Sequence, residues 1–295
     1  MIHISSPTAM SPHSEPIRCD GASFAQQSSE RFCVPFLLRA KPARDEQDLR
    51  VSLLTLGVET SGLAGAIALR RNGETLESVS IEQVGRRHAQ TLVSEVDALL
   101  RRHALTAKQL EVIAVSIGPG SFTGLRVGVV FAKTLAYAVG CRLAAVDTFR
   151  AIAAASPDDV SEVFVVSDAQ RGDLFVGHYV RETVATSDCD ITNWTRPAAI
   201  SIQPQEDFCR RFGEIAGAQP SIALSGIAAE SLRANLPNSV RILGSEFRSP
   251  QANLIAQLGE HQAQANELAD HWTLEPFYLR RSAAEEKAAL RPSPN

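Results

Sequence analysis

The sequence is poor in the residues that build small crosslinked or metal-bound domains. Its five cysteines are odd in number and widely spaced, and no two of them form a C-x-x-C pair. A disulfide framework needs an even set of cysteines, and a zinc ribbon needs closely spaced ones. The sequence therefore predicts neither, and it favours a reducing, cytoplasmic environment. The cysteines are Cys19, Cys33, Cys141, Cys189 and Cys209.

Excess positive charge and long apolar runs are also missing. The formal net charge of the 295 residues is −4, whereas a protein that grips nucleic acid by itself presents a clustered basic face. No run of apolar residues approaches the roughly 18 that a membrane span needs. These absences argue against an independent nucleic-acid-binding protein and against a membrane protein.

The first 50 residues differ in composition from the rest of the chain. They are rich in Ser, Pro and Gln and show no hydrophobic periodicity, which predicts a disordered extension. The short apolar run at 32–38 is interrupted by Pro35. It lacks the basic start, the length and the cleavage site of a signal peptide.

From residue 51 onward, apolar patterns predict alternating strands and helices. Residues 51–81 hold three strand-like runs separated by two turns, and residues 86–103 repeat apolar positions at helical spacing. The expected order is therefore β-β-β-α-β-α-β-α. The later elements are a strand over 111–118, a helix over 121–139, a strand over 142–147 and a helix from Thr148.

The second half of the chain starts again in the same way. At an offset of 109 residues, 53–69 lies over 162–178, and in each an apolar strand ends in an acid, Glu59 or Asp168, before a polar turn and a second strand. Such duplication predicts an α/β fold with two tandem actin-like (ribonuclease-H-like) lobes, mixed sheets flanked by helices. We expect lobes at 51–150 and 151–281, with the C-terminal helix (251–269) packing back on the first lobe and a flexible tail at 282–295.

The segment at 117–140 carries many glycines for an apolar helix, reading IGPGSFTGLRVGVVFAKTLAYAVG. It is not a Walker loop, which needs a lysine after its last glycine, and Thr123 replaces the third glycine of a dinucleotide-binding loop. Every fourth position from 120 to 140 is Gly or Ala, so the helix carries a slanting stripe of small residues. Close backbone packing offsets the low helix propensity of glycine. Packing logic favours a contact inside the domain, and a contact with another protein remains the alternative.

Several motifs in order resemble the TsaB family, over about residues 51–281. They are LTLGVETSGLAGAIAL, RRHAQTLVSEVDALL, SIGPGSFTGLRVGVVFAKTLAYAVGCRLAAVDTF, VVSDAQRGDLFVGHY and EPFYLR. The resemblance implies an accessory subunit of bacterial tRNA threonylcarbamoyladenosine synthesis. It implies pairing with a TsaD-like catalytic subunit, a TsaE-like ATPase as a further partner, self-association when alone, and contact with tRNA only through the complex.

The TsaD subunit itself is the close alternative within this resemblance. TsaD holds a metal with an H-x-x-x-H pair, but no two of the seven histidines here are four residues apart, and 148–160 contains none. We therefore predict no catalytic residues, no metal and no cofactor of the chain's own, with ATP and Mg²⁺ acting at the level of the complex.

The resemblance implies partner contacts on the helices at 86–103 and 121–139. We therefore predict that the stripe of small residues packs partly inside the domain and partly against the partner. The candidate interface residues are His88, Leu92, Glu95, Gly120, Gly124, Arg126, Gly128 and Lys133. Arg126 is read either as an interface ion-pair donor or as a local cap.

A candidate cleft between the lobes comprises Glu59, Thr60, Ser61, Asp168 and Arg171. Glu59 stands where an actin-like kinase places a phosphate- or metal-directed aspartate, although a structural turn residue is the simpler reading. The alternative function is thus an independent actin-like-fold, ATP-dependent enzyme of the small-molecule kinase type that uses Glu59 and Asp168.

Overall fold

The computed structural model describes residues 53–62, 64–81, 88–182, 191–217 and 219–280. The predicted disordered extension at 1–50 and the predicted tail at 282–295 lie outside the described residues, and so do the side chains of 88–90.

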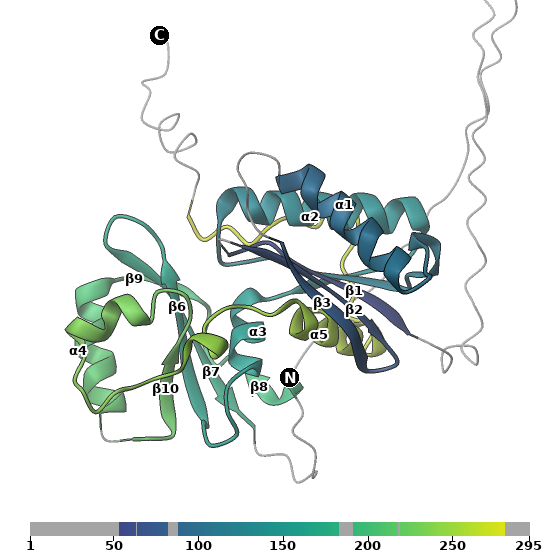
Figure 1. Cartoon of the computed structure of the whole chain (residues 1–295). Helices are drawn as coiled ribbons and strands as arrows, with labels where there is room; N and C mark the ends of the chain where they lie inside the picture. The colour runs from purple at the N-terminus through teal and green to yellow at the C-terminus, as the bar shows by residue number, and fades with distance from the viewer. Residues whose placement is uncertain (1–52, 63, 82–87, 183–190, 218, 281–295) are drawn as a thin grey trace, which may run out of the picture. The chain divides into compact units, whose positions relative to one another are not determined.

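The first half of the described chain forms a five-stranded sheet with the strand order β3-β2-β1-β4-β5. Strand β1 pairs antiparallel with β2 and parallel with β4, and β4 pairs parallel with β5. The predicted order of elements over this half is confirmed (Figure 1). The strands are β1 (Leu54–Glu59), β2 (Gly65–Arg71), β3 (Glu74–Ile81), β4 (Val112–Ser116) and β5 (Arg142–Val146).

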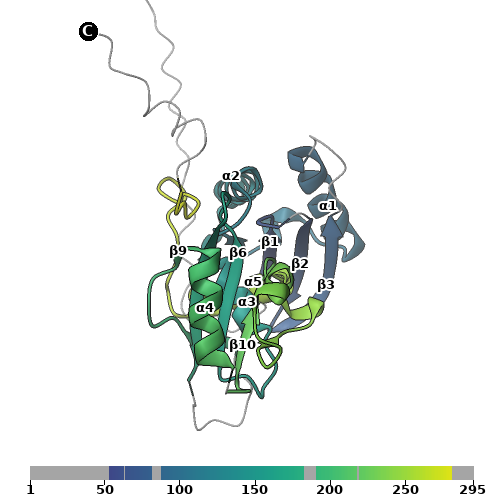
Figure 2. The same cartoon turned by 90° about the vertical axis from the view of Figure 1, so that its left-hand side faces the viewer.

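Helices cover both faces of this sheet. Helix α1 (His88–Arg102) and helix α2 (Phe122–Val139) lie side by side on one face, and helix α5 (Ala252–Gln264) lies on the other (Figure 2). The alternation of β1 explains the two layers, because Leu56 faces the α1–α2 side, whereas Gly57 gives α5 room to approach the strand. The C-terminal helix is therefore packed on the first sheet.

The second half forms another mixed sheet, with the order β11-β10-β6-β7-β8 and β9 added beside β7. Strands β6 and β7 form an antiparallel hairpin, as β1 and β2 do, and Asp168 ends β6 as Glu59 ends β1. The predicted duplication of an α/β unit is thus confirmed. The elements are α3 (Thr148–Ala154), β6 (Glu162–Asp168), β7 (Asp173–Arg181), β8 (Trp194–Thr195), β9 (Ser201–Pro204), α4 (Gln205–Ala216), β10 (Ile222–Ser225) and β11 (Arg241–Ile242).

Short 3-10 helices complete the described structure at η2 (Ala107–Gln109), η3 (Ile191–Asn193), η4 (Glu230–Asn235) and η5 (Ser245–Phe247). Between β10 and β11 the chain thus forms a 3-10 helix rather than an α-helix.

Helix α2 has well-defined ends. The Ser121 side chain accepts a hydrogen bond from Gly124 N at 3.3 Å, and Gly140 ends the helix in the left-handed conformation with φ of 71°. By length and composition alone, its 18 residues are apolar enough to cross a membrane. Arg126 and Lys133 interrupt its apolar residues, so α2 is not an uninterrupted apolar run of this length. The property is weak support for a span, since core helices of globular proteins share it, and α2 packs on β4.

Candidate functional site

Helix α2 is seated on the turn that follows β1, at residues 60–61. A Cβ atom on Gly124 would overlap the backbone oxygen of Thr60, and one on Gly128 would overlap the Thr60 hydroxyl. A Cβ on Gly120 would lie 2.6 Å from the backbone oxygen of Ser61. Glycine is the residue that permits so close an approach between two backbones. The glycines therefore allow α2 to pack closely on the chain's own turn at residues 60–61. This close packing explains why an apolar helix contains so many glycines.

The remainder of the small-residue stripe also faces the domain interior. Ala132 and Ala136 are fully buried, and Gly140 is the exposed C-terminal cap. At Gly128, Ala132 and Ala136 the small side of the helix is thus filled by the same chain, while Gly120 and Gly124 are half-buried, and a partner contact on part of the stripe stays a prediction. Leu92 is likewise buried in the core on α1 and offers no surface to a partner.

Glu59 is buried inside the molecule rather than exposed in a cleft. Its side chain is 1% exposed, and its Oε1 accepts hydrogen bonds from both the backbone N and the hydroxyl of Ser61. Burial raises the pKa of Glu59 above its ordinary value, against the lowering effect of these bonds. Thr60 and Ser61 are buried as well. The prediction that these three residues line a cleft is therefore wrong.

Asp168 and Arg171 lie on the exposed turn between β6 and β7. Asp168 Oδ1 accepts from Gln170 N at 2.7 Å, and Gln170, Arg171 and Gly172 all have positive φ, of 67°, 61° and 81°. The turn is tightly wound and solvent-facing, and Asp168 acts there as a local cap. Asp168 is exposed, whereas Glu59 is buried, so the two acids differ in their access to solvent.

The outward side of α1 and α2 exposes apolar side chains that the sequence analysis missed. Val93 on α1 is 56% exposed, and Val130 and Tyr137 on α2 are 62% and 54% exposed. Val130 lies four residues after Arg126 and seven before Tyr137, so helical spacing places these three on one side of α2. That spacing is the signal that could have identified them. We call Val130, Tyr137 and the neighbouring Trp272 the outer apolar face.

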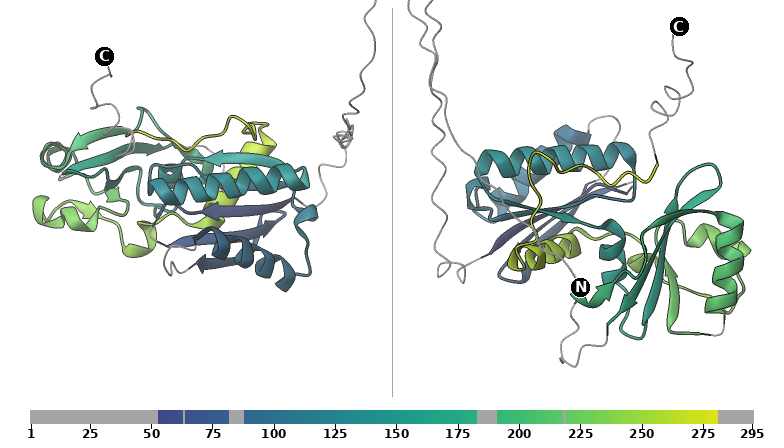
Figure 3. Two further views of the ribbon diagram at one scale, coloured as in Figure 1. Left: turned by 90° about the horizontal axis from the view of Figure 1, so that it is seen from above. Right: turned by 180° about the vertical axis from the view of Figure 1, so that it is seen from behind.

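Arg126 and Lys133, both predicted interface residues, hold the C-terminal strap (residues 268–280). Arg126 Nε donates to the Tyr278 hydroxyl at 3.0 Å, and its guanidinium lies 4.4 Å from the ring centre of Phe122. Lys133 Nζ donates to the backbone oxygens of Trp272 and Leu274, at 3.2 and 2.8 Å. Both cations are thus engaged within the chain, and they fix the strap along α2 (Figure 3).

The strap also places an aromatic ring on the outer apolar face and joins the two sheets. Trp272 is 74% exposed and packs edge-on against Tyr137, with ring centres 5.1 Å apart. Phe277 N donates to Ile117 O at 2.7 Å. Arg280 reaches Asp173 Oδ2 at 2.6 Å at the start of β7.

Of the other candidates, Glu95 is half-buried on α1, and His88 begins that helix.

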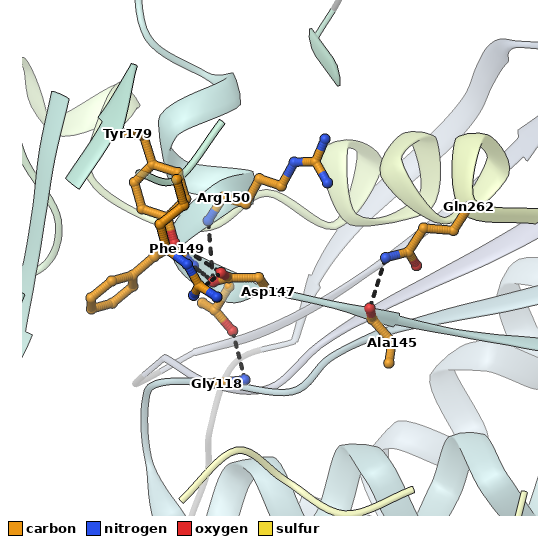
Figure 4. Close-up of polar contacts among 9 residues, drawn as sticks. Gly118, Ala145, Asp147, Phe149, Arg150, Tyr179 and Gln262 are labelled. Carbon is orange, nitrogen blue, oxygen red and sulfur yellow. Dashed lines mark hydrogen bonds and ion pairs between the residues drawn. The ribbon is translucent and has the colours of Figure 1, made fainter. Parts of the chain in front are cut away.

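Asp147, which the sequence analysis did not single out, joins the first sheet to the second (Figure 4). It follows β5 and caps α3, where Oδ1 accepts from Phe149 N and Arg150 N. Oδ2 accepts from the Tyr179 hydroxyl and from Arg196 Nη1, both at 2.9 Å. Burial raises the pKa of Asp147, and the hydrogen bond with Tyr179 and the Arg196 charge oppose that effect. Only the cap could be foreseen, because Tyr179 and Arg196 are remote in sequence.

Within the described ranges, no group of three or more His, Cys, Asp or Glu side chains is arranged to hold a metal ion. The two described cysteines, Cys141 and Cys209, are buried free thiols.

Comparison with known proteins identifies the family. The family model for TsaD, tRNA N6-adenosine threonylcarbamoyltransferase, matches residues 75–288. The TsaB protein of Haemophilus influenzae is 25% identical over 246 residues, which cover 80% of this chain and 97% of that protein. The TsaB protein of Bacillus subtilis is 26% identical over 79% of this chain and 96% of its own length. The chain belongs to the TsaB branch of the TsaD family.

The solved structures agree on the fold. YeaZ from Pseudomonas aeruginosa is 22% identical, with a TM-score of 0.62 over 77% of this chain and 100% of that one. A second structure from that organism, described as similar to the peptidase YeaZ, has a TM-score of 0.65 and 23% identity over 77% of this chain and all of its own. The predicted two-lobe actin-like α/β fold is confirmed.

Family members named as the transferase itself match a smaller part of the chain. The tRNA N6-adenosine threonylcarbamoyltransferase of Desulfovibrio desulfuricans is 33% identical over 113 residues, which cover 34% of this chain and 31% of that protein. The TsaB proteins of Haemophilus influenzae and Bacillus subtilis, in contrast, align along nearly their whole length.

Proposed function

We propose that this chain is a non-catalytic, dimerising subunit of the complex that transfers a threonylcarbamoyl group to N6 of adenosine 37 in tRNA. Membership of the TsaB branch supports a role in this modification, since TsaB relatives are named as biosynthesis proteins of threonylcarbamoyladenosine. The observation that carries the non-catalytic role is the seating of α2 on the turn at 60–61. The helix covers Thr60 and Ser61, and Glu59 is buried beside them, so the acid in the first half has no access to a substrate.

The outer apolar face supports a protein partner. Exposed apolar and aromatic side chains grouped on one surface are typical of protein interfaces, where Trp and Tyr carry a large share of the binding energy. Val130, Tyr137 and Trp272 are such a group. We assign this face, rather than the glycine stripe, to the TsaD-like catalytic subunit, and to a second copy of the chain when that subunit is absent.

The proposal includes the remaining partners as participants in the complex. A TsaE-like ATPase joins the pair, ATP and Mg²⁺ act there rather than in this chain, and tRNA is contacted through the complex in the cytoplasm.

Co-purification with the cognate TsaD-like subunit tests this function. Val130→Asp places a charge on the outer apolar face, and burying an unpaired charge in an interface costs more than the roughly 1.4 kcal/mol that changes an affinity tenfold. We expect at least a tenfold weaker complex with unchanged thermal stability of the subunit. Ile215→Asp is the matched control, because Ile215 is also an exposed apolar residue, on α4.

Size-exclusion chromatography of the two proteins, with and without nucleotide and the TsaE-like ATPase, gives the readout. Wild type and Ile215→Asp should elute with the partner, and Val130→Asp should not. If both variants bind the partner equally well, the assignment of the outer apolar face is refuted. If the wild type does not bind under any of these conditions, the proposed function is refuted. Saturable ATP binding by the isolated chain that Glu59→Ala abolishes would instead favour the kinase-type enzyme.

A further inference from the structure

Glu59 is a buried acid with one oxygen satisfied and one without a partner. Its Oε1 accepts two hydrogen bonds from Ser61, whereas among the described residues its Oε2 has no hydrogen-bond partner. An ionised carboxylate in this position would keep a full share of its charge on a buried, unbonded oxygen. Such burial of an uncompensated charge costs several kcal/mol, which proteins usually avoid by keeping the group neutral.

On the neighbouring strand, the buried Ser116 hydroxyl also lacks a hydrogen-bond partner among the described residues. Val58 of β1 pairs in parallel register with Val115 of β4, so Glu59 and Ser116 are the next residues on the two strands and face the same side of the sheet. The Ser116 hydroxyl is fully buried and, within the described chain, makes no hydrogen bond of normal geometry. It lies close enough to the carboxyl group to lower the pKa of Glu59, an effect smaller than the rise caused by burial. A single hydrogen bond between Oε2 and the hydroxyl would satisfy both atoms, and with a neutral acid it would do so without burying a charge.

No charge from the surrounding elements replaces that proton. On β2 and α5, Arg70 and Glu260 pair with each other at 3.2 Å, and Arg70 lies opposite Thr55, four residues before Glu59. On α2, Arg126 and Lys133 are engaged with the strap. The other titratable groups on these three elements are Arg71, His261 and Tyr137. Among the influences on the pKa of Glu59, burial comes first and raises it, whereas the polar groups of Ser61, Ser116 and Gly62 lower it by less.

We infer that Glu59 is a neutral carboxylic acid that donates from Oε2 to Ser116, accepts from Ser61 on Oε1, and thereby positions the turn on which α2 is seated. The acid links β1, β4 and the turn at 60–61, and the turn fixes α2 through Gly120, Gly124 and Gly128. Glu59 is thus a positioning residue, remote from the outer apolar face that it orients. This last consequence rests on the proposed function, whereas the protonation state does not.

The pH dependence of stability separates this arrangement from an ionised one. Below the ordinary pKa of 4.5, both the folded and the unfolded chain carry the proton, and the contribution of Glu59 to stability is complete. As the pH rises, the unfolded chain ionises first, so this contribution is lost until folded Glu59 ionises too. Between those two pKa values the folding equilibrium constant falls about tenfold per pH unit on account of this one group.

Glu59→Gln mimics the neutral acid, since its amide nitrogen donates to Ser116 and its oxygen accepts from Ser61. Urea unfolding at several pH values measures the folding equilibrium constant of each protein. We expect the ratio of this constant, variant over wild type, to rise about tenfold per pH unit above the ordinary pKa of the acid. Glu260→Gln is the matched control, a buried acid with a cationic partner. It should be less stable than wild type, because Arg70 then stays buried without its counter-charge. A ratio for Glu59→Gln that stays constant or falls with pH would overturn the inference.

Infrared difference spectroscopy of the folded protein reads the proton directly. The carbonyl stretch of a protonated carboxylic acid should persist at about pH 7, disappear in Glu59→Gln and remain in Glu260→Gln. In Ser116→Ala the band should shift, because the acid loses its acceptor. Absence of the band from the wild type would refute the neutral acid, even if the partner never binds.

Binding to the TsaD-like subunit tests the positioning role separately. We expect Glu59→Gln to associate like the wild type and Glu59→Ala to associate at least tenfold more weakly while Val130 and its neighbours are unchanged. Should Glu59→Ala fail to fold, Ser116→Ala serves in its place. If Glu59→Ala or Ser116→Ala binds the TsaD-like subunit as tightly as the wild type does, the positioning role is refuted. If the wild type itself does not bind, only the proposed function is contradicted.

Discussion

Substitution of Gly124 by Ala tests most directly how α2 is held. In an exposed helix this change stabilises by up to about 1 kcal/mol, because alanine has the higher helix propensity. Here the added Cβ would overlap the backbone oxygen of Thr60, which cannot rotate away as a flexible side chain can. Relief requires α2 to move off the turn.

The magnitude follows from the contacts that such a movement disturbs. Overpacking a well-filled interior costs about 1–3 kcal/mol, and the hydrogen bond from Ser121 N to Ser61 O, 2.8 Å long, is worth about 1 kcal/mol more. After the gain in propensity, we expect the free energy of unfolding to fall by about 1–3 kcal/mol. For a protein of this size that lowers the melting temperature by about 3–9 °C.

Thermal and urea unfolding followed by circular dichroism provide the assay. Gly213→Ala in α4 is the control, because the added Cβ meets only the Pro237 ring, at 3.0 Å, and stability should change by less than about 1 kcal/mol. Unchanged or increased stability of Gly124→Ala, combined with lost binding to the TsaD-like subunit, would refute the reasoning and return the glycine stripe to the partner interface.

Two further predictions concern groups buried away from the outer apolar face. Tyr179→Phe removes the hydroxyl that donates to Asp147 at 2.9 Å, and since bonds to charged groups contribute about 1.5–3 kcal/mol, the free energy of unfolding should fall by that amount; a value equal to wild type would show that this bond does not hold the two sheets together. Burial raises the pKa of the Cys141 thiol to about 12, so mass spectrometry after treatment with a thiol reagent should find Cys141 modified only once the protein unfolds, and rapid modification of the native protein would contradict its burial.

Several structural features could be read from particular residues before any contact was known. The acids that end β1 and β6 stand 109 positions apart, and the hairpins that they introduce have the same antiparallel pairing. Ser121 and Gly140 mark the ends of α2 by their capping chemistry. These are local signals, because hydrophobic period and cap chemistry act over a few residues.

The site was predicted less well because it depends on contacts between remote residues. The stripe of small residues correctly indicated a close backbone approach, but spacing alone does not name the neighbour, which is the turn at 60–61. Arg126 and Lys133 were placed on α2 correctly, yet their partners lie 152 and 141 residues later, in the strap. The exposure of Val130 could not be predicted, since an exposed valine and a buried one look alike in a helical pattern.

The sequence by itself determined the order of strands and helices, the duplicated α/β unit and the resemblance to the TsaB family, because periodicity, capping and motif identity are properties of neighbouring residues. Tertiary structure alone decided that the glycines face Thr60 and Ser61, that Glu59 is enclosed beside Ser116, and that Asp147 meets Tyr179 and Arg196. Burial and hydrogen bonding between distant segments arise only when the chain is packed, and they set the protonation of an acid and the exposure of a valine.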